Sequence, residues 1–345
     1  MKPRRVTLKD IAEDLGVSVI TVSKALRNRG SVSLATRRRV LKRAKELDYQ
    51  PNLAARSLVT GRSFSIGLVV PDLVHPFFAE VAKGIARKIK PKGYFLIIVS
   101  TEEDPETEER QIQNLLARQV DAILIASTRC QAADFDKIEG RKIPYVLIDR
   151  KISGLDANYV GVDDERLGTM AAEHLIACGC RRIAHIRGPE ISTGIERLRG
   201  YRSALARNGL KVRPEYVVAR VSSDDTADLT GYQAMRQLLR LSPPPDGVFC
   251  YNDPTAIGAM KAAFEAGFRV PEDVKLIGAG NDRYASELRV PLTSIDQGNR
   301  LLGQKAGQLV LSLIDALEPP EAKAIVIPPH LIVRQSTRNP RLANA

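Results

Sequence analysis

The residues whose types and spacing could do chemistry gather near the start of the chain. Residues 18–24 read Ser-Val-Ile-Thr-Val-Ser-Lys, which alternates hydroxyl groups, branched apolar groups and one cation. Hydroxyls and a lysine can contact phosphates, and Val19 and Ile20 can contact thymine methyl groups in the major groove. If these side chains point outward on one short helix, they complete a DNA-contacting face made by Ser18, Thr21, Ser23 and Lys24.

The charge of the chain is concentrated around this segment. Residues 1–62 contain 15 Lys/Arg and 5 Asp/Glu, a net charge of +10, whereas the whole chain of 345 residues carries +12. A small basic module joined to a nearly neutral body is the electrostatic pattern of a nucleic-acid-binding protein.

The first 50 residues predict three short helices that hold this face. Thr7 and Asp10 have capping-box spacing, and Gly16 and Ser18 supply a tight turn followed by an N-cap. A second helix is expected at about 19–27 and a third, capped by Ser33, at about 34–47. Two short helices joined by a tight turn predict a helix–turn–helix unit. Residues 52–59 have helical composition, but eight residues are too few for a helix that is stable alone.

From residue 65 the pattern changes to short apolar strands alternating with amphipathic helices, which indicates βαβ units and parallel sheets. The number of βαβ units is larger than one open sheet usually holds. The sequence therefore favours two similar α/β lobes, with a TIM barrel as the alternative. Polar pairs follow five of the strands and predict a polar small-molecule cleft. They are Pro71-Asp72, Asp149-Arg150, Asp163-Asp164, Asn252-Asp253 and Asn281-Asp282.

Signals for an enzyme are weak. We expect no catalytic residues, no cofactor and no bound metal. The four histidines are scattered, and the cysteines 130, 178, 180 and 250 form no C-x-x-C pair or zinc-ligand spacing. Gly278-Ala279-Gly280 follows a strand, but the third glycine of a dinucleotide fingerprint is missing. No apolar run is long enough for a membrane span and no secretory signal is present, which favours a reducing cytoplasm.

The chain resembles the LacI/GalR family of bacterial transcription regulators over essentially its whole length. The resemblance rests on many short motifs in the family's order and spacing. They are Thr7–Ala12, Gly16–Ser18, Thr21–Leu26, Val32–Ser33, Thr36–Arg37, Leu47–Tyr49, Pro51–Asn52, Ala55–Leu58, Ile66–Gly67, Arg197–Tyr201, Asn252–Asp253, Pro291–Thr293 and Gln297.

This resemblance implies a homodimer that reads a near-palindromic operator, most simply as a repressor controlled by a sugar or related metabolite. It implies a hinge helix that orders on DNA and wedges Leu58 between base pairs in the minor groove. A corepressor protein stays an open possibility. The positions that match DNA contacts are Thr7, Ser18, Val19, Ile20, Thr21, Ser23, Lys24, Ser33, Thr36, Tyr49, Asn52, Ala55 and Leu58, and Arg27 adds charge where Asn is usual.

The resemblance also implies a core like a periplasmic sugar-binding protein, with the effector between its lobes. Gly280 stands where many sugar-binding members carry Asp, so Asn281 or Asp282 is expected to take over that role. The positions that match the effector cleft are Phe77, Phe78, Asp149, Arg197, Asn252 and Gln297 together with Asn281.

The family's pattern divides the chain into five parts. They are a helix–turn–helix domain (1–50), a hinge (51–62), a first lobe (63–162 with 294–327), a second lobe (163–293 with 328–338) and a tail (339–345). The tail carries no heptad-bearing helix, so a tetramer is not expected. Two other classes remain open: a binding protein serving transport, and a nucleotide-dependent oxidoreductase resting only on Gly278–Gly280.

The hinge generates the first testable prediction. Leu58→Ala should lower operator affinity and leave effector affinity unchanged, because the leucine side chain would act only in the kinked duplex. Operator binding is measured by electrophoretic mobility shift and effector binding by calorimetry. Unchanged operator affinity would contradict the hinge mechanism in this chain.

Overall fold

The computed structural model describes residues 6–26, 32–50, 57, 60–129, 131–219, 226–318 and 320–338. The chain separates into two compact units, Met1–Ser63 and Phe64–Ala345. We call the first the headpiece and the second the core.

The headpiece contains three helices, α1 (Leu8–Leu15), α2 (Val19–Leu26) and α3 (Leu34–Glu46). Thr7 and Asp10 form the expected capping box, in which the Thr7 amide donates to Asp10 Oδ2 at 2.7 Å. Gly16 ends α1 in the left-handed region at φ 62°. The helices enclose a small apolar core, made by Ile11, Ala12, Val22, Ala25, Val40 and Ala44. The helix–turn–helix prediction is confirmed, whereas most of the predicted hinge helix at 52–59 lies outside the described residues.

The first lobe of the core is built on a sheet of six parallel strands in the order β11-β5-β4-β3-β1-β2. Its strands are β1 (Ser65–Val70), β2 (Phe95–Ser100), β3 (Ala122–Ile125), β4 (Tyr145–Ile148), β5 (Tyr159–Val162) and β11 (Ala324–Ile327). Alternate residues of β1 point to opposite faces. Leu68 packs towards α5 (Pro76–Ile89) and α12 (Asn299–Asp315) and Val69 towards α6 (Pro105–Ala117). A short 3-10 turn (Ala132–Phe135) and α7 (Asp136–Glu139) complete that second face.

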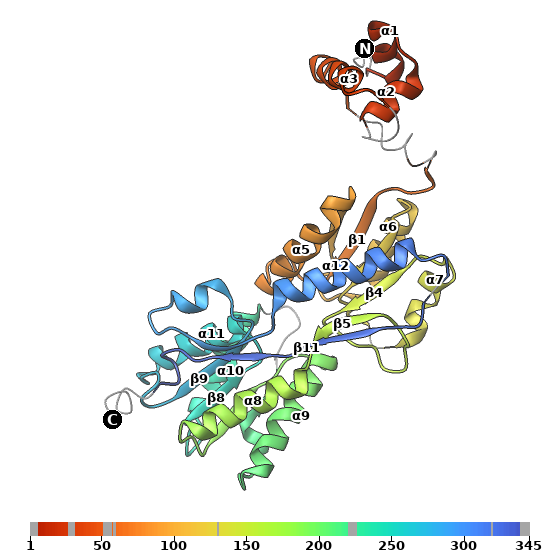
Figure 1. The fold of residues 1–345 in the computed structure, drawn as a ribbon. Coiled ribbons are helices and arrows are strands. Elements are labelled where there is room, and N and C mark those ends of the chain that lie inside the picture. Colours follow the sequence, from red (N-terminus) through yellow and green to blue (C-terminus); the bar gives the residue numbers. More distant parts are fainter. Residues whose placement is uncertain are drawn as a thin grey trace. The chain divides into compact units, whose positions relative to one another are not determined.

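The second lobe repeats this plan with the strand order β12-β10-β9-β8-β6-β7, in which only β12 runs antiparallel to its neighbour. Its strands are β6 (Ile183–Ile186), β7 (Val217–Val218), β8 (Gly247–Cys250), β9 (Lys275–Ala279), β10 (Thr293–Asp296) and β12 (His330–Ile332). The helices α8 (Asp164–Ala177) and α9 (Ser192–Arg207) cover one face, and α10 (Ala227–Leu239) and α11 (Asp253–Glu265) cover the other. Two separate open sheets exclude the TIM barrel (Figure 1).

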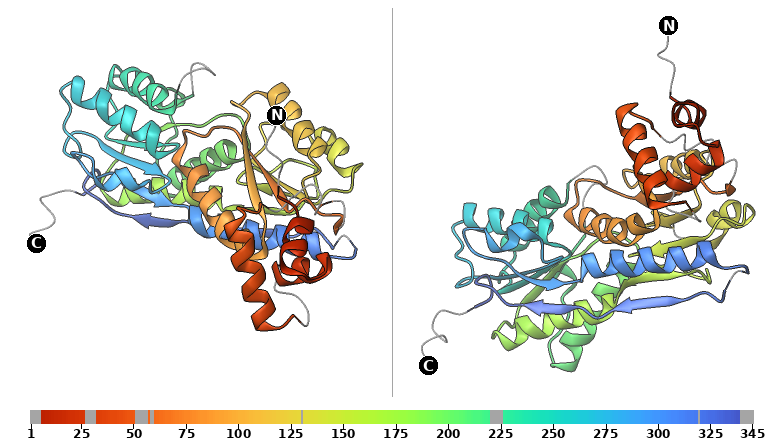
Figure 2. Two further views of the ribbon diagram at one scale, coloured as in Figure 1. Left: turned by 90° about the horizontal axis from the view of Figure 1, so that it is seen from above. Right: turned by 45° about the horizontal axis from the view of Figure 1, so that its top comes forward.

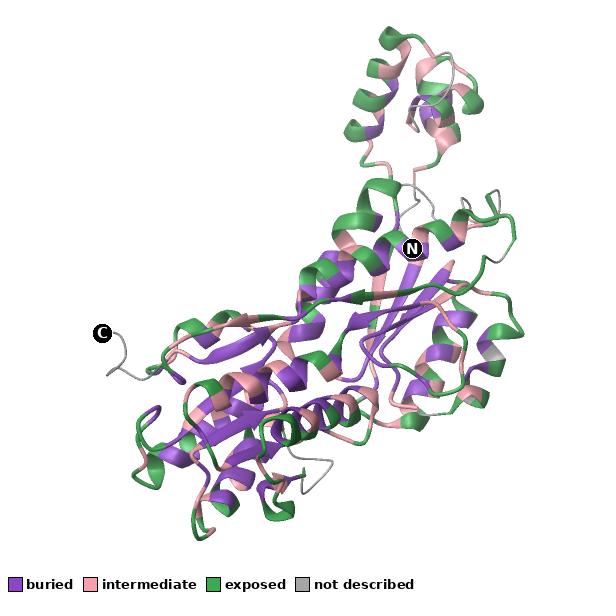
Figure 3. Cartoon of the chain, turned by 60° about the horizontal axis from the view of Figure 1, so that its bottom comes forward, coloured by how far each residue is buried: buried purple, intermediate pink, exposed green. Residues whose placement is uncertain are grey.

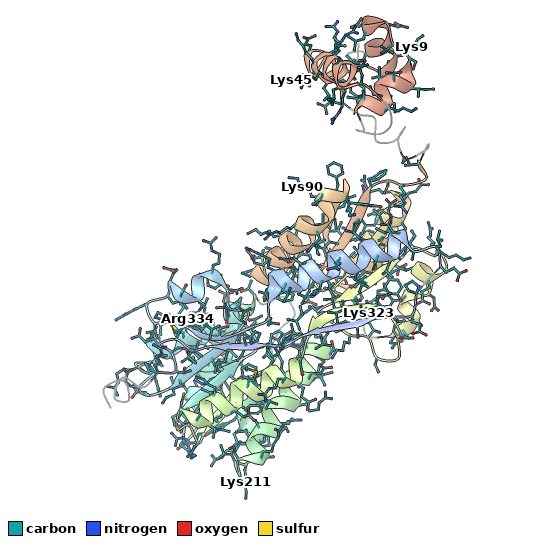
Figure 4. All side chains as sticks on the ribbon, in the orientation of Figure 1. Lys9, Lys45, Lys90, Lys211, Lys323 and Arg334 are labelled. Atoms are coloured by element: carbon teal, nitrogen blue, oxygen red, sulfur yellow. The ribbon has the colours of Figure 1, made fainter. Side chains whose placement is uncertain are left out.

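The chain passes between the lobes three times. It leaves the first sheet after Val162, returns after Asp296, and leaves again after Ile327. Figure 4 shows this last passage, with Lys323 on the first lobe and Arg334 on the second. Because β10 is a strand of the second sheet, the return falls after residue 296 rather than at the expected boundary of 293 and 294.

The central strands of both sheets are buried on both faces, as Figure 3 shows, whereas the edge strands are partly exposed. Doubly covered parallel sheets explain why the strands read as continuous apolar runs. None of the helices in the described part of the chain is long and apolar enough to cross a membrane.

Two helix pairs next to the cleft pack backbone to backbone through glycines. On α8 and α9, a Cβ added at Gly168 would overlap the Arg197 carbonyl, and one at Gly200 would overlap that of Glu165. The pair α5 and α12, which run side by side in Figures 1 and 2, meets in the same way at Gly84 and Gly303. These approaches fix the spacing of the helices that line the cleft described below.

The α5–α12 contact predicts the sign of the change in stability for a Gly→Ala substitution. At an open helical site Gly→Ala stabilises by about 1 kcal/mol. Gly84→Ala should instead lower the free energy of unfolding by about 1–3 kcal/mol, because the new methyl group meets the backbone carbonyl of Arg300. Urea unfolding measures the change.

The matched control is Lys83→Ala on the same helix, whose ammonium makes an exposed pair with Glu80 at 3.0 Å. Its effect should stay within about 0.5 kcal/mol. A gain in stability for Gly84→Ala would contradict the close approach of the helices.

Candidate functional site

The outward face of α2 carries the side chains that the sequence predicts for base contacts. Val19 is 42% exposed and Ile20 is 66% exposed, and Lys24 is exposed beside them. Val22 and Ala25 on the opposite face are fully buried. Two adjacent branched side chains held in water next to hydroxyls and a cation suit the major groove, where thymine methyl groups offer apolar contact.

Hydroxyl pairs stand at the N-termini of α2 and α3. The Thr21 amide donates to Ser18 Oγ at 3.1 Å, and the two hydroxyl oxygens lie 2.9 Å apart. Ser33 and Thr36 repeat this arrangement with distances of 3.2 and 2.9 Å. Because helix N-termini attract anions, these caps place hydroxyl donors where phosphates are favoured.

The other predicted DNA contacts fall into two groups. Thr7 is exposed, whereas Ser23 and Tyr49 are half-buried, with Tyr49 packed against the headpiece core. Arg27, Asn52, Ala55 and Leu58 lie outside the described residues.

Between the lobes of the core lies a cavity of about 860 Å³. This volume is in the range of small-molecule sites. Six of the seven residues predicted for an effector line it, namely Phe77, Phe78, Asp149, Arg197, Asn252 and Gln297. Phe77 and Phe78 come from the start of α5, Arg197 from α9, and the others from the residues that follow β4, β8 and β10, as expected for ligand sites in open α/β sheets.

Asn281, the seventh predicted residue, is not among the residues that line this cavity. Its amide oxygen accepts from Arg334 Nη2 at 2.6 Å, and its amide nitrogen donates to Asp296 Oδ2 at 3.2 Å. Both partners lie at the β10–β12 side of the second sheet, so Asn281 links strand ends there.

Arg197 is held from three directions. Its Nε donates to Asp164 Oδ1 at 2.7 Å, Nη1 to the Tyr251 carbonyl at 2.7 Å, and Nη2 to Gln297 Oε1 at 2.8 Å. The guanidinium also lies 4.5 Å from the centre of the Tyr251 ring. Burial raises the pKa of Asp164 to about 7, against the attraction of Arg197. The arginine thus has fixed orientation and presents its remaining N–H groups to the cavity.

Among the lining residues that the sequence did not predict as effector contacts, His75, Arg150 and Tyr251 make the contacts that shape the cavity. Arg150 makes two bonds to Glu103, at 3.0 and 2.7 Å, which bring a loop after β2 to the cleft. The strand-end pair Asp149-Arg150 signalled the place of this arginine but not its partner. Nothing in the local sequence indicates that Tyr251 would lie against Arg197, because they come from different elements.

His75 forms a direct bridge between the lobes. Asn252 Nδ2 donates to His75 Nε2 at 3.0 Å, while Asn252 Oδ1 accepts from the Thr255 amide at 2.9 Å. Accepting this bond requires an unprotonated Nε2. Burial lowers the pKa of His75 to about 4, so the ring is neutral at physiological pH and the bridge is intact.

The cavity offers hydrogen-bonding groups and aromatic faces but no recognisable catalytic constellation. Across the described ranges, no group of three His, Cys, Asp or Glu side chains is placed to hold a metal ion. The Gly278–Gly280 turn packs against the Asp253 side chain and leads into a short 3-10 turn at Arg283–Ser286. A dinucleotide fingerprint would require a full helix there.

Comparison with known proteins agrees with both parts of the molecule. Residues 7–52 match the family model for bacterial regulatory proteins of the lacI family, and residues 172–337 match the periplasmic binding protein-like domain. The ribose operon repressor of Halalkalibacterium halodurans is 32% identical over 333 residues, covering 96% of this chain and 97% of the relative. The CytR repressor of Escherichia coli K12 is 34% identical over 334 residues and covers 96% of each chain.

Solved structures give the same answer. The lac repressor dimer bound to operator and the anti-inducer ONPF superposes with a TM-score of 0.83 at 28% identity, covering 97% of this chain and 99% of that one. The CelR–cellobiose complex gives 0.72 at 31% identity and covers 96% and 100%.

Headpiece, core and relatives together define a DNA-binding transcriptional regulator, and the relatives carry the names of regulators rather than of enzymes. The chain belongs to the lacI family of bacterial regulatory proteins.

The ion pair of Arg197 generates the next prediction. Arg197→Ala should lower the free energy of unfolding of the core by about 3–5 kcal/mol, because it leaves Asp164 buried without its partner. Guanidinium unfolding followed by circular dichroism measures the loss.

The same two helices supply a matched control. Arg199 and Glu165 form a pair at 2.7 Å in which both side chains are exposed. Arg199→Ala should cost less than about 1 kcal/mol. Equal losses in the two variants would mean that burial does not decide the value of the Arg197 pair.

Proposed function

We propose that this protein is a transcriptional repressor that binds a near-palindromic operator as a homodimer and is controlled by a small molecule in the interlobe cavity. A sugar or related metabolite is the effector class. The observation that carries the proposal is the exposed reading face of α2, centred on Val19 and Ile20, in a chain whose core encloses the cavity.

The base-reading role is assigned to Val19, Ile20 and Lys24, and phosphate contacts to hydroxyl and ring groups around them. The latter are Thr7, Ser18, Thr21, Ser23, Ser33, Thr36 and Tyr49. Arg27, Asn52, Ala55 and Leu58 complete the interface by their match to family positions. A cytoplasmic location is part of this proposal, because its DNA ligand lies there.

An exposed apolar surface of the first lobe supports the homodimer. β2 is the edge strand of its sheet, and its Phe95 and Ile98 are 58% and 41% exposed. Beside it, a groove of about 400 Å³ runs between β2 and α5, lined by Leu73, Phe78 and other apolar residues. An uncovered apolar edge strand invites pairing with another chain. A second copy is the occupant that a palindromic operator requires.

The cavity supports regulation because its walls belong to both lobes. Phe77, Phe78 and Asp149 come from the first lobe, and Arg197 and Asn252 from the second. We assign these residues and Gln297 to the effector. A compound that bridges the walls would change how the lobes close and thereby the affinity for operator.

The domain division proposed here follows the family's pattern, with the second crossing moved to the β10–α12 connection. The headpiece comprises 1–50, the hinge 51–62, the first lobe 63–162 with the segment from α12 to β11, the second lobe 163–296 with 328–338, and the tail 339–345.

Selection from a random-sequence duplex library by the purified full chain tests the proposal. We expect an enriched imperfect palindrome, and its release by one compound of a sugar and metabolite panel. An enriched sequence without symmetry would contradict the dimeric reading, and no enriched sequence at all would overturn the proposal.

The reading face gives a variant pair for the selected operator. Ile20→Ala should weaken binding roughly tenfold, because each lost base contact costs about 1–3 kcal/mol. Leu41→Ala on α3 is the control, since its side chain is 43% exposed and lies outside the predicted face. Fluorescence anisotropy with a labelled operator measures both. Equal loss in the two variants would refute base reading by α2.

A further inference from the structure

The balance of charge in the interlobe cavity narrows the chemistry of the effector beyond the class proposed above. Three arginines line the cavity, and each is already paired with a carboxylate of this chain. Arg150 binds Glu103, Arg197 binds Asp164, and Arg187 binds Glu190. Each arginine among the described lining residues therefore already has a carboxylate partner, and Arg150 Nε is the guanidinium nitrogen of the Arg150–Glu103 pair that makes no hydrogen bond.

Negative charge is in excess on the same walls. Besides Glu103, which Arg150 compensates, four carboxylates are among the described lining residues, namely Asp72, Glu102, Asp149 and Asp228. The one histidine among the described lining residues, His75, is neutral, because burial lowers its pKa to about 4. The field inside the cavity therefore opposes an incoming phosphate or carboxylate.

Asp149 is the carboxylate for which the structure supplies no donor. The residue is 9% exposed, its side-chain oxygens are not among the fully sealed polar atoms, and no hydrogen bond to them is donated by the described residues. The nearest positive atom is Arg150 Nε, 4.0 Å from Oδ2. Burial raises the pKa of Asp149 accordingly. A largely buried carboxylate that opens to the cavity without donors from the described residues favours a ligand that supplies them.

The backbone of Asp149 holds this carboxylate in place. Its φ is 64°, the left-handed region that is uncommon for a residue with a side chain. Its amide donates to the Val160 carbonyl at 3.0 Å, and its carbonyl accepts from Tyr159 Oη at 3.1 Å. Strained conformations that neighbours enforce in this way cluster at ligand sites.

We propose that the effector carries no negative charge and presents a hydroxyl or ammonium group to Asp149, so that phosphorylated or carboxylated compounds are rejected. This inference rests on the proposed function and narrows its effector. The aromatic walls of Phe77, Phe78 and Tyr251 supply apolar contact for the body of the same compound.

The first experiment sorts compounds by charge. A bacterial small-molecule extract is separated into neutral, cationic and anionic fractions, and each is tested for a shift in the melting temperature of the full chain. The matched probes D-glucose, D-glucosamine, D-glucose 6-phosphate, D-ribose and D-ribose 5-phosphate are tested in parallel. We expect the shift from the neutral or the cationic fraction, and these two results separate a hydroxyl donor from an ammonium donor.

Activity confined to the anionic fraction, or no shift from any fraction, would overturn the inference. The operator selection described above is run on the same preparation. If the operator selection succeeds and the thermal-shift experiment gives either negative result, the proposed function stands and only the inference about the effector's charge is rejected.

The second experiment uses the active fraction, or the compound purified from it, with two variants. Asp149→Asn should weaken its binding at least tenfold and reduce discrimination against the anionic fraction. Asparagine tolerates the left-handed backbone, so the fold is retained. Glu102→Gln is the control, because it removes the same charge from an exposed position on the cavity wall. Equal effects of the two substitutions would show a general field rather than a contact to Asp149 and would overturn that assignment.

Discussion

The buried pair of Arg197 and Asp164 is the interaction on which the effector site depends. Asp164 is the first residue of α8, immediately after the chain first crosses between the lobes, and Gln297 follows the strand at the second crossing. By binding both, Arg197 ties α9 to two of the three connections. A charge taken out of water is tolerated only with complete partners, and this requirement fixes the position of the guanidinium. The orientation of the cleft wall thus follows from one electrostatic constraint.

Close helix packing makes that pair possible. Gly168 on α8 lies against the backbone of Arg197 itself, and Gly200 on α9 lies against that of Glu165. A side chain at either glycine would separate the helices and lengthen the 2.7 Å contact between Arg197 and Asp164. The glycines contribute no chemistry, yet the geometry of the ion pair depends on the space they leave open. The close packing of α8 and α9 thus holds this polar site in a fold whose central strands are covered on both faces, and no shift of the sheet is needed.

Much of this arrangement could be predicted from local sequence. The cap at Thr7, the turn at Gly16 and the strand-end position of Asp149 are short-range signals, and the structure has each of them where it was expected. What local signals could not supply were partners from distant segments. Asn281 follows a strand like Asp149 does, but Arg334, 53 residues later, binds it away from the cavity. The bridge from His75 to Asn252 spans 177 residues and likewise has no local signature.

The aromatic wall of the cavity gives the two halves of the proposed mechanism a physical connection. Phe78 lines the interlobe cavity and also the apolar groove beside β2. Its ring meets that of Phe77 edge to face, with 5.0 Å between the ring centres, and His75 lies 6.0 Å away. Packed rings cannot move independently, because interiors have few voids to accept a displaced ring. A compound that displaced His75 or Phe77 would therefore be expected to change the shape of the groove as well, because the cavity and the surface where a second copy would pack share Phe78.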